Sequence, residues 1–198
     1  MAGDNIHARI MVDEMVKAGM PPNLIINEEG TKRAEKLSAW LQNDIDSPQS
    51  VKTLDTEYVE VDKFDGENVL TLIQQRQTDY LIIAGCGAII KDNILSLSCP
   101  INIHPGLLPQ FRGLDPVLWA IDKQESLGAT VHIMDEGIDT GDILLSEPMR
   151  AQNPQSILEA RLQVLRWGGK LLGEFLKNPK QYPPQKQDES KACYYSAY

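Results

Sequence analysis

Two short segments of the chain carry polar side chains suited to reactions at a carbonyl group. In the first segment, Asn102 and His104 stand two residues apart at the end of an apolar stretch. Alternate side chains of an extended strand point to the same side, so both would face one site. An amide N–H can donate to a carbonyl oxygen, and an imidazole titrates near neutral pH. Together they could stabilise the oxyanion that forms when a nucleophile attacks a carbonyl carbon.

The second segment, residues 134–142, contains two glycines and four acidic residues within nine positions. This composition predicts a tight acidic loop after an apolar run. A carboxylate from such a loop could orient His104 and relay the proton that an attacking amine loses. The candidate chemistry is therefore nucleophilic attack on a carbonyl group, with an amide, an imidazole and a carboxylate at one site.

The elements that must position these residues follow an alternating pattern. Short apolar runs alternate with helical patterns, which is typical of an α/β protein. The run Tyr80–Ala84 is apolar throughout, as expected for a strand covered on both faces. Strands are predicted at 24–27, 58–61, 80–84, 100–103, 129–134 and 143–145, and helices at 5–19, 31–43, 66–77, from 116 to about 121, and at 154–177.

The last of these helices has the clearest limits. Asn153 is a suitable N-cap, Pro154 suits the first helical position, and Asn178-Pro179 should end the helix. Apolar or small residues recur along it with alternating spacings of four and three, which indicates one narrow stripe packed against the sheet. A dimer seam, and so a homodimer, is the alternative. The stripe consists of Leu158, Leu162, Leu165, Gly169, Leu172 and Leu176.

We expect a Rossmann-like domain with a mostly parallel open sheet flanked by helices. A domain of this class normally opens with a strand, but residues 1–5 are too few and too polar to form one. The usual first strand is therefore expected to be missing. Residues 1–182 are predicted to form the catalytic domain and residues 183–198 a polar C-terminal tail.

The composition of the chain disfavours some classes of binding partner. A net charge of -9 repels phosphate backbones, so nucleic acid is disfavoured as a partner. The three cysteines are an odd number without C-x-x-C spacing, which fits a reducing cytoplasm. The sequence has neither an apolar run long enough to span a membrane nor a signal-peptide pattern at its start. We expect a cytoplasmic protein with no membrane partner.

The motifs resemble those of a known family. Residues 102–109 read Asn-x-His-Pro-Gly-Leu-Leu-Pro, residues 111–113 read Phe-Arg-Gly, and residues 135–141 read Asp-Glu-Gly-Ile-Asp-Thr-Gly. Together they resemble the formyltransferase superfamily, which includes phosphoribosylglycinamide, methionyl-tRNA and amino-sugar N-formyltransferases. The resemblance is dense over about 80–147. Separated motifs in the right order are far more specific than either motif alone.

The resemblance implies roles for particular residues. Asn102 would polarise the formyl carbonyl of N10-formyltetrahydrofolate, His104 would stabilise the tetrahedral intermediate, and Asp139 would pair with His104 and assist proton transfer. It also implies a cis peptide at Leu108–Pro109 and requires no metal. Backbone groups of two loops would hold the folate: Gly87, Ala88, Ile89 and Ile90 in one, and Glu136, Gly137 and Ile138 in the other.

The predicted function is transfer of the formyl group to a primary amine of a small molecule, a nucleotide-linked amino sugar being one candidate. The resemblance leads us to expect that the barrel-like second domain of the tRNA branch is missing here, and this expectation, together with the acidity of the chain, disfavours a tRNA acceptor. One alternative is hydrolysis of formyl-folate, with water in place of the amine. Another is a non-catalytic folate-binding or interaction protein, because of the missing strand.

Three further features have structural explanations. His132 is expected to pack or to make a local hydrogen bond within its strand. Arg112 should shape its turn, although it could instead meet an acidic group of the acceptor. The run Gly85-Cys86-Gly87 suggests the start of a dinucleotide-binding fingerprint, but Ile90 stands where that motif needs glycine, so nicotinamide binding is rejected.

Overall fold

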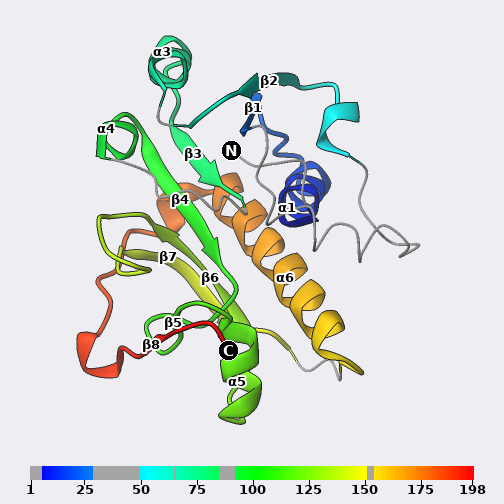
Figure 1. Ribbon diagram of the computed structural model, residues 1–198, viewed down its shortest axis with the longest axis vertical. Coiled ribbons are helices and arrows are strands. Elements are labelled where there is room, and N and C mark those ends of the chain that lie inside the picture. The colour runs from blue at the N-terminus through cyan, green and yellow to red at the C-terminus, as the bar shows by residue number, and fades with distance from the viewer. Residues whose placement is uncertain (1–5, 29–49, 65, 85–91, 151–153) are drawn as a thin grey trace. The chain divides into compact units, whose positions relative to one another are not determined.

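A computed structural model describes most of the chain (Figure 1). The described residues are 6–28, 50–64, 66–84, 92–150 and 154–198. They belong to two compact units, residues 1–101 and 102–198. The predicted helix at 31–43 and the residues predicted to form the first folate loop lie outside the described residues. Among the described helices, none combines the length and the apolar character needed to cross a membrane.

The first unit alternates helices and strands, as the sequence pattern predicts. Strands β1 and β2 are parallel, with Leu24 opposite Glu57. Helix α4 was not predicted, because four residues are too few to show a helical period. The elements are α1 (Ile6–Lys17), β1 (Leu24–Glu28), the 3-10 turn η1 (Val51–Thr53), β2 (Glu57–Val61), α3 (Glu67–Gln75), β3 (Tyr80–Ile83) and α4 (Asp92–Leu95).

A small hydrophobic core joins α1, β1, η1 and β2. Val12, Ile25 and Val51 are buried together, and Leu54 and Tyr58 pack against them. Strand β3 ends at Ile83, one residue before the predicted end, and Ile83 and the following Ala84 are buried. Tyr80 and Ile82 are only half-buried, so the two faces of the strand are not equally covered. Strand β3 neighbours β4. There the backbone N–H of Cys99 donates to the carbonyl of Asp79 at 3.2 Å.

Strand β4 (Cys99–His104) leads into the second unit. In this unit β6 lies between β4 and β7, and β6 and β7 are antiparallel, with Gly128 opposite Pro148. The short strands β5 and β8 form a separate parallel pair. The remaining elements are β5 (Arg112–Gly113), α5 (Pro116–Asp122), β6 (Gly128–Ile133), β7 (Ile143–Pro148), α6 (Ile157–Lys177), η2 (Pro179–Gln181), η3 (Glu189–Lys191) and β8 (Tyr194–Tyr195).

Helix α6 covers β6 and β7 (Figure 1). Val131 of β6 and Val164 and Leu172 of α6 are fully buried, so the predicted packing of this helix against the sheet is confirmed. The buried face differs in part from the predicted stripe. Leu165, Gly169 and Leu172 of the stripe are buried, whereas Leu158, Leu162 and Leu176 are only half-buried. Leu171 and Phe175, which the stripe did not include, are buried as well.

The start of α6 differs from the prediction. The N-cap is Ser156, whose hydroxyl accepts the backbone N–H of Glu159. The predicted cap, Asn153, lies outside the described residues. The Glu159 carboxylate accepts in return from the N–H of Gln155. A serine followed three residues later by glutamate matches the sequence of a capping box, although the carboxylate here accepts from Gln155 and not from the N-cap residue itself. The helix therefore starts later than the proline suggested. The helix ends at Lys177, before Asn178-Pro179, as predicted.

The second unit thus supplies a strand end, β4, next to a loop that joins β6 and β7. The predicted α/β class is confirmed. Both segments singled out for their chemistry lie within this one unit, at the end of β4 and in the loop between Ile133 and Ile143.

Candidate active site

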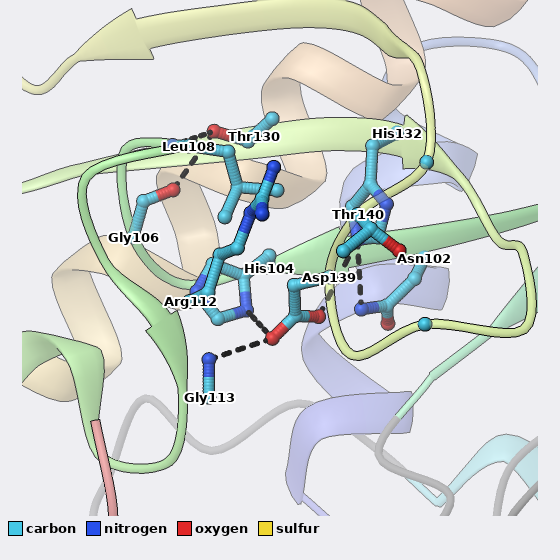
Figure 2. A network of polar contacts seen from close by, with 12 residues as sticks. Asn102, His104, Gly106, Leu108, Arg112, Gly113, Thr130, His132, Asp139 and Thr140 are labelled. Carbon is cyan, nitrogen blue, oxygen red and sulfur yellow. Dashed lines mark hydrogen bonds and ion pairs between the residues drawn. The ribbon is translucent and has the colours of Figure 1, made fainter. Parts of the chain in front are cut away.

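The structure brings Asn102, His104 and Asp139 together (Figure 2). Asn102 and His104 project from the same side of β4, as their spacing predicts, and the β6–β7 loop carries Asp139 to them. The His104 Nδ1 atom lies 3.5 Å from Asp139 Oδ2. The His104 side chain is buried, and only 14% of the Asp139 side chain is exposed. A charge on either group is therefore poorly screened by water.

The imidazole of His104 is fixed by its second nitrogen. Nε2 lies 2.6 Å from the carbonyl oxygen of Phe111. A carbonyl can only accept, so Nε2 must carry a proton in either ionisation state. Nδ1 is therefore the ring nitrogen that faces the Asp139 carboxylate.

Asp139 is held in an unusual backbone conformation. Its φ is +55°, a region that residues other than glycine seldom adopt. Its Oδ2 accepts the backbone N–H of Gly113 at 2.9 Å, which fixes the carboxylate from the side opposite the loop. Nearby, a Cβ at Gly141 would overlap the carbonyl oxygen of Ile133, so this turn of the loop requires glycine. Non-glycine residues in this region tend to occur where function demands them.

A second histidine, His132, completes the group. Its Nε2 lies 3.2 Å from the Asn102 amide nitrogen and 3.7 Å from Asp139 Oδ1. Its ring meets that of His104 edge-on at 6.4 Å between centroids. The sequence predicted only packing or a local hydrogen bond for this residue. The local bond exists, from Nδ1 to the Ile133 carbonyl at 2.9 Å, but the contact with Asn102 was missed.

His132 is neutral at physiological pH. Burial, and after it the nearby His104, lower the pKa of His132 to about 4, and the attraction of Asp139 restores only part of this shift. With the Nδ1 proton donated to Ile133, Nε2 presents a lone pair and accepts from the Asn102 amide. The sequence offered one indication that His132 faces the site, its spacing of two residues from Thr130 along a predicted strand. Such spacing does not identify Asn102, 30 residues away, as the partner of His132.

Thr130 fixes the loop that follows His104. Its buried hydroxyl accepts the backbone N–H of Leu108 at 3.1 Å and lies 2.8 Å from the carbonyl of Gly106 (Figure 2). The peptide bond between Leu108 and Pro109 is cis, as the resemblance implied. The loop leads directly to Phe111, whose carbonyl holds the His104 ring.

Arg112 does not face an acceptor. Its side chain is 0% exposed, and its guanidinium pairs with Glu189 of the same chain at 2.6 Å. The suggestion that Arg112 meets an acidic group of the acceptor is therefore wrong, because the chain supplies the acid itself. The hydrogen bond to Glu189 raises the pKa of Arg112, and the same contact lowers the pKa of Glu189.

The residues predicted to hold a folate are only partly described. Glu136, Gly137 and Ile138 form the exposed stretch of the loop just before Asp139, and the Ile138 side chain is 66% exposed. Residues 87–90 lie outside the described residues. An exposed apolar side chain beside the polar cluster could contact a flat ligand, but the folate-binding roles of both loops stay predictions.

Known proteins resemble this chain in sequence and in fold. A methionyl-tRNA formyltransferase from Caldicellulosiruptor saccharolyticus is 34% identical over 141 residues, which cover 69% of this chain and 45% of that protein. This chain thus spans about half the length of the curated relatives it matches.

Solved structures show the same fold. A sugar N-formyltransferase from a Shewanella species superposes with a TM-score of 0.69 at 21% identity, covering 98% of this chain and 74% of that one. A formyltransferase from Anoxybacillus kamchatkensis, solved with tetrahydrofolate and a UDP-linked formamido sugar, gives a TM-score of 0.58 at 20% identity, covering 87% and 84%. The sequence model of the family described as formyl transferase matches residues 18–172, most of the chain. The chain therefore belongs to the formyl transferase family.

Proposed function

We propose that this chain transfers a formyl group from N10-formyltetrahydrofolate to the primary amine of a small molecule. The observation that carries the proposal is the convergence of Asn102, His104 and Asp139 within one unit. Membership of the formyl transferase family adds the group that is transferred. In this reaction the formyl donor is a substrate, which binds and leaves in each turnover.

The first step is attack of a neutral amine on the formyl carbon. A C–N bond forms, and the carbonyl oxygen becomes an oxyanion. The Asn102 amide is turned so that its nitrogen faces His132, and its second N–H is the donor that we assign to this oxygen. A proton on His104 Nδ1 adds positive charge beside the oxyanion. Preorganised donors of this kind are typically worth a factor of about a hundred or more in rate.

The second step moves a proton. The attacking amine becomes cationic and must lose a proton before the intermediate can collapse forward. Asp139 accepts it, and the protonated His104 Nδ1, 3.5 Å from Asp139 Oδ2, stays protonated beside the carboxylate. The bond from carbon to N10 of the folate then breaks, and N10 takes up a proton. The products are a formamide and tetrahydrofolate, so protons and electrons balance without an added reagent.

The acceptor is the finer part of the proposal. A net charge of -9 favours a small amine over a tRNA, because a polyanion would be repelled at long range. A nucleotide-linked amino sugar is our leading candidate. Methionyl-tRNA is the second candidate, because it is the acceptor named for the curated relatives.

An acceptor screen tests the proposal. The chain is incubated with formyl-folate and, separately, with amino sugars linked to a nucleotide, glycinamide ribonucleotide and methionyl-tRNA, and formylated products are measured by mass spectrometry. The proposal expects a formamide from a small amine. Tetrahydrofolate released at the same rate without any amine would show hydrolysis, and formylation of the tRNA alone would replace the small acceptor. Absence of turnover with every acceptor, despite folate binding, would contradict the proposed activity.

A further inference from the structure

We propose that Gln187, in the C-terminal segment, is a positioning residue that holds Asp139 in its reactive place. The inference rests on the proposed role of Asp139 in formyl transfer. Gln187 lies 48 residues beyond Asp139 in the sequence. The hydrogen bonds of its amide nitrogen go to backbone carbonyls and not to the three candidate catalytic side chains. Gln187 acts on the backbone of the loop that carries Asp139.

The Gln187 side chain makes two hydrogen bonds to the backbone of the loop. The Gln187 side-chain nitrogen donates to the carbonyl of Asp139 at 2.9 Å and to the carbonyl of Gly141 at 2.7 Å. The two acceptors lie on either side of Thr140. Asp139 has a φ of +55°, which costs free energy unless the surroundings fix it. Two hydrogen bonds to carbonyls in the same turn are a direct way to fix it.

Arg112 holds the other end of the Gln187 amide. Its Nη2 and Nε atoms both donate to Gln187 Oε1, at 2.8 and 3.1 Å. The guanidinium is itself fixed by Glu189 and by the hydroxyl of Tyr194, at 2.6 and 2.7 Å. With the oxygen turned toward Arg112, the amide nitrogen of Gln187 can only face the loop. The buried arginine thus sets the orientation of the amide.

The same C-terminal segment also controls the carboxylate side of Asp139. Strand β8 pairs with β5, and the backbone of Gly113 passes so close to Tyr195 that a Cβ would overlap its carbonyl oxygen. The Gly113 N–H, positioned in this way, donates to Asp139 Oδ2 (Figure 2). Before Gln187, the backbone of Gln185 exchanges two hydrogen bonds of 2.8 Å with Ile143, where the loop ends. Asp139 is therefore held by hydrogen bonds to its backbone, from Gln187, and to its carboxylate, from Gly113.

The test is the substitution Gln187→Glu, with Gln185→Glu as the matched control. A glutamate keeps an oxygen for Arg112 but has no N–H for the two loop carbonyls. Gln185 has an exposed side chain and makes its contacts with Ile143 through its backbone. We expect kcat of Gln187→Glu to fall at least about tenfold relative to the control, in line with the loss of one to two hydrogen bonds.

Two readouts separate positioning from a general loss of stability. The first is exchange of the Gly113 amide hydrogen, measured by NMR, which reports the bond to Asp139 Oδ2 without any turnover. We expect it to speed up at least about tenfold in Gln187→Glu and to be unchanged in Gln185→Glu. The second is Asp139→Asn combined with Gln187→Glu, which should be no slower than Asp139→Asn alone, because both remove the same function.

The inference is overturned if Gly113 exchange and kcat in Gln187→Glu stay within about twofold of the control. It is also overturned if the two substitutions reduce kcat multiplicatively. If Gln187→Glu fails to fold, Gln187→Met supplies the same comparison with the shape of the side chain kept. Because the Gly113 readout needs no substrate, a chain that proves inactive in formyl transfer still reports whether Gln187 holds Asp139.

Discussion

The Asn102 amide nitrogen lies 3.2 Å from Nε2 of His132, and the opposite ring nitrogen of His132 donates to the Ile133 carbonyl at 2.9 Å. The donated proton leaves Nε2 as an acceptor, so the Asn102 amide cannot turn its oxygen toward His132 without repulsion. A residue outside the three family motifs therefore sets which way the proposed oxyanion donor faces. Substituting His132 tests this relationship directly.

The first prediction compares His132→Gln with His132→Leu. Glutamine can place its side-chain oxygen near the position of Nε2 and continue to accept from Asn102, whereas leucine cannot. We expect kcat of the leucine variant to be about tenfold below that of the glutamine variant, since one hydrogen bond near 1.4 kcal/mol is a factor of ten. Steady-state kinetics with the acceptor found in the screen measures it. Equal kcat values in the two variants would show that His132 does not orient Asn102.

The second prediction concerns stability and pH. Burial lowers the pKa of His132 to about 4, below the ordinary value of 6.5 that it regains on unfolding. As pH falls through 6.5, the unfolded chain binds the proton first, so folding is weakened progressively down to about pH 4. Above pH 6.5 this contribution is fully present. The neutral, buried His132 thus contributes about 3 kcal/mol in all to the pH dependence of the free energy of unfolding.

Urea unfolding at pH 7 and near pH 4.5 measures this effect. The His132→Gln variant is the control, because glutamine does not titrate, and it should lose about 2 to 3 kcal/mol less stability than the parent chain over that range. If the parent and the variant lose the same stability on acidification, His132 is not buried in its neutral form.

The third prediction concerns the loop after His104. Thr130→Val keeps the shape of the side chain but removes the hydroxyl that bonds Leu108 and Gly106. Leaving those buried backbone groups without a partner should lower the free energy of unfolding by about 2 kcal/mol. Thr130→Ser, which retains the hydroxyl, should lose less than half as much. Urea denaturation of the two variants measures both losses. A loss in Thr130→Val no larger than that in Thr130→Ser would contradict the role assigned to the hydroxyl.

Local sequence patterns predicted the parts of the site that lie close together along the chain. Asn102 and His104 were placed on one strand face by their spacing, and a two-residue period leaves little freedom. The loop between β6 and β7 was predicted from its glycines and acids. Its pairing with His104 came from the resemblance, because spacing does not report which of four acidic residues turns inward.

Sequence patterns could not predict the contacts between segments that are far apart in the chain. Arg112 and Gln187 are 75 residues apart, and nothing in either segment indicates that they meet. A buried arginine is identified only when its acid, Glu189, is found in space. The N-cap at Ser156 was missed for a different reason. Asn153-Pro154 also matches a helix start, and the prediction chose it over the serine and glutamate that follow.

The fourth prediction concerns the proton on His104. His104→Gln can still donate to the Phe111 carbonyl but cannot hold an exchangeable proton next to Asp139. We expect its kcat to fall by a factor of about a hundred or more, the same fall that we expect for His104→Ala, while folate affinity changes less than about threefold. Kinetics and equilibrium binding of tetrahydrofolate measure the two effects. If glutamine restores most of the rate lost in the alanine variant, the imidazole serves only to hold the loop.

The most direct test of the account is single-turnover transfer of an isotopically labelled formyl group by the parent chain and by Asp139→Asn. Asparagine keeps an oxygen for the Gly113 N–H, so the loop is retained while the proton acceptor is lost. We expect the transfer rate of the variant to be at least about a hundredfold lower, with labelled donor bound equally well. A rate within about threefold of the parent would contradict the claim that Asp139 and His104 together drive formyl transfer.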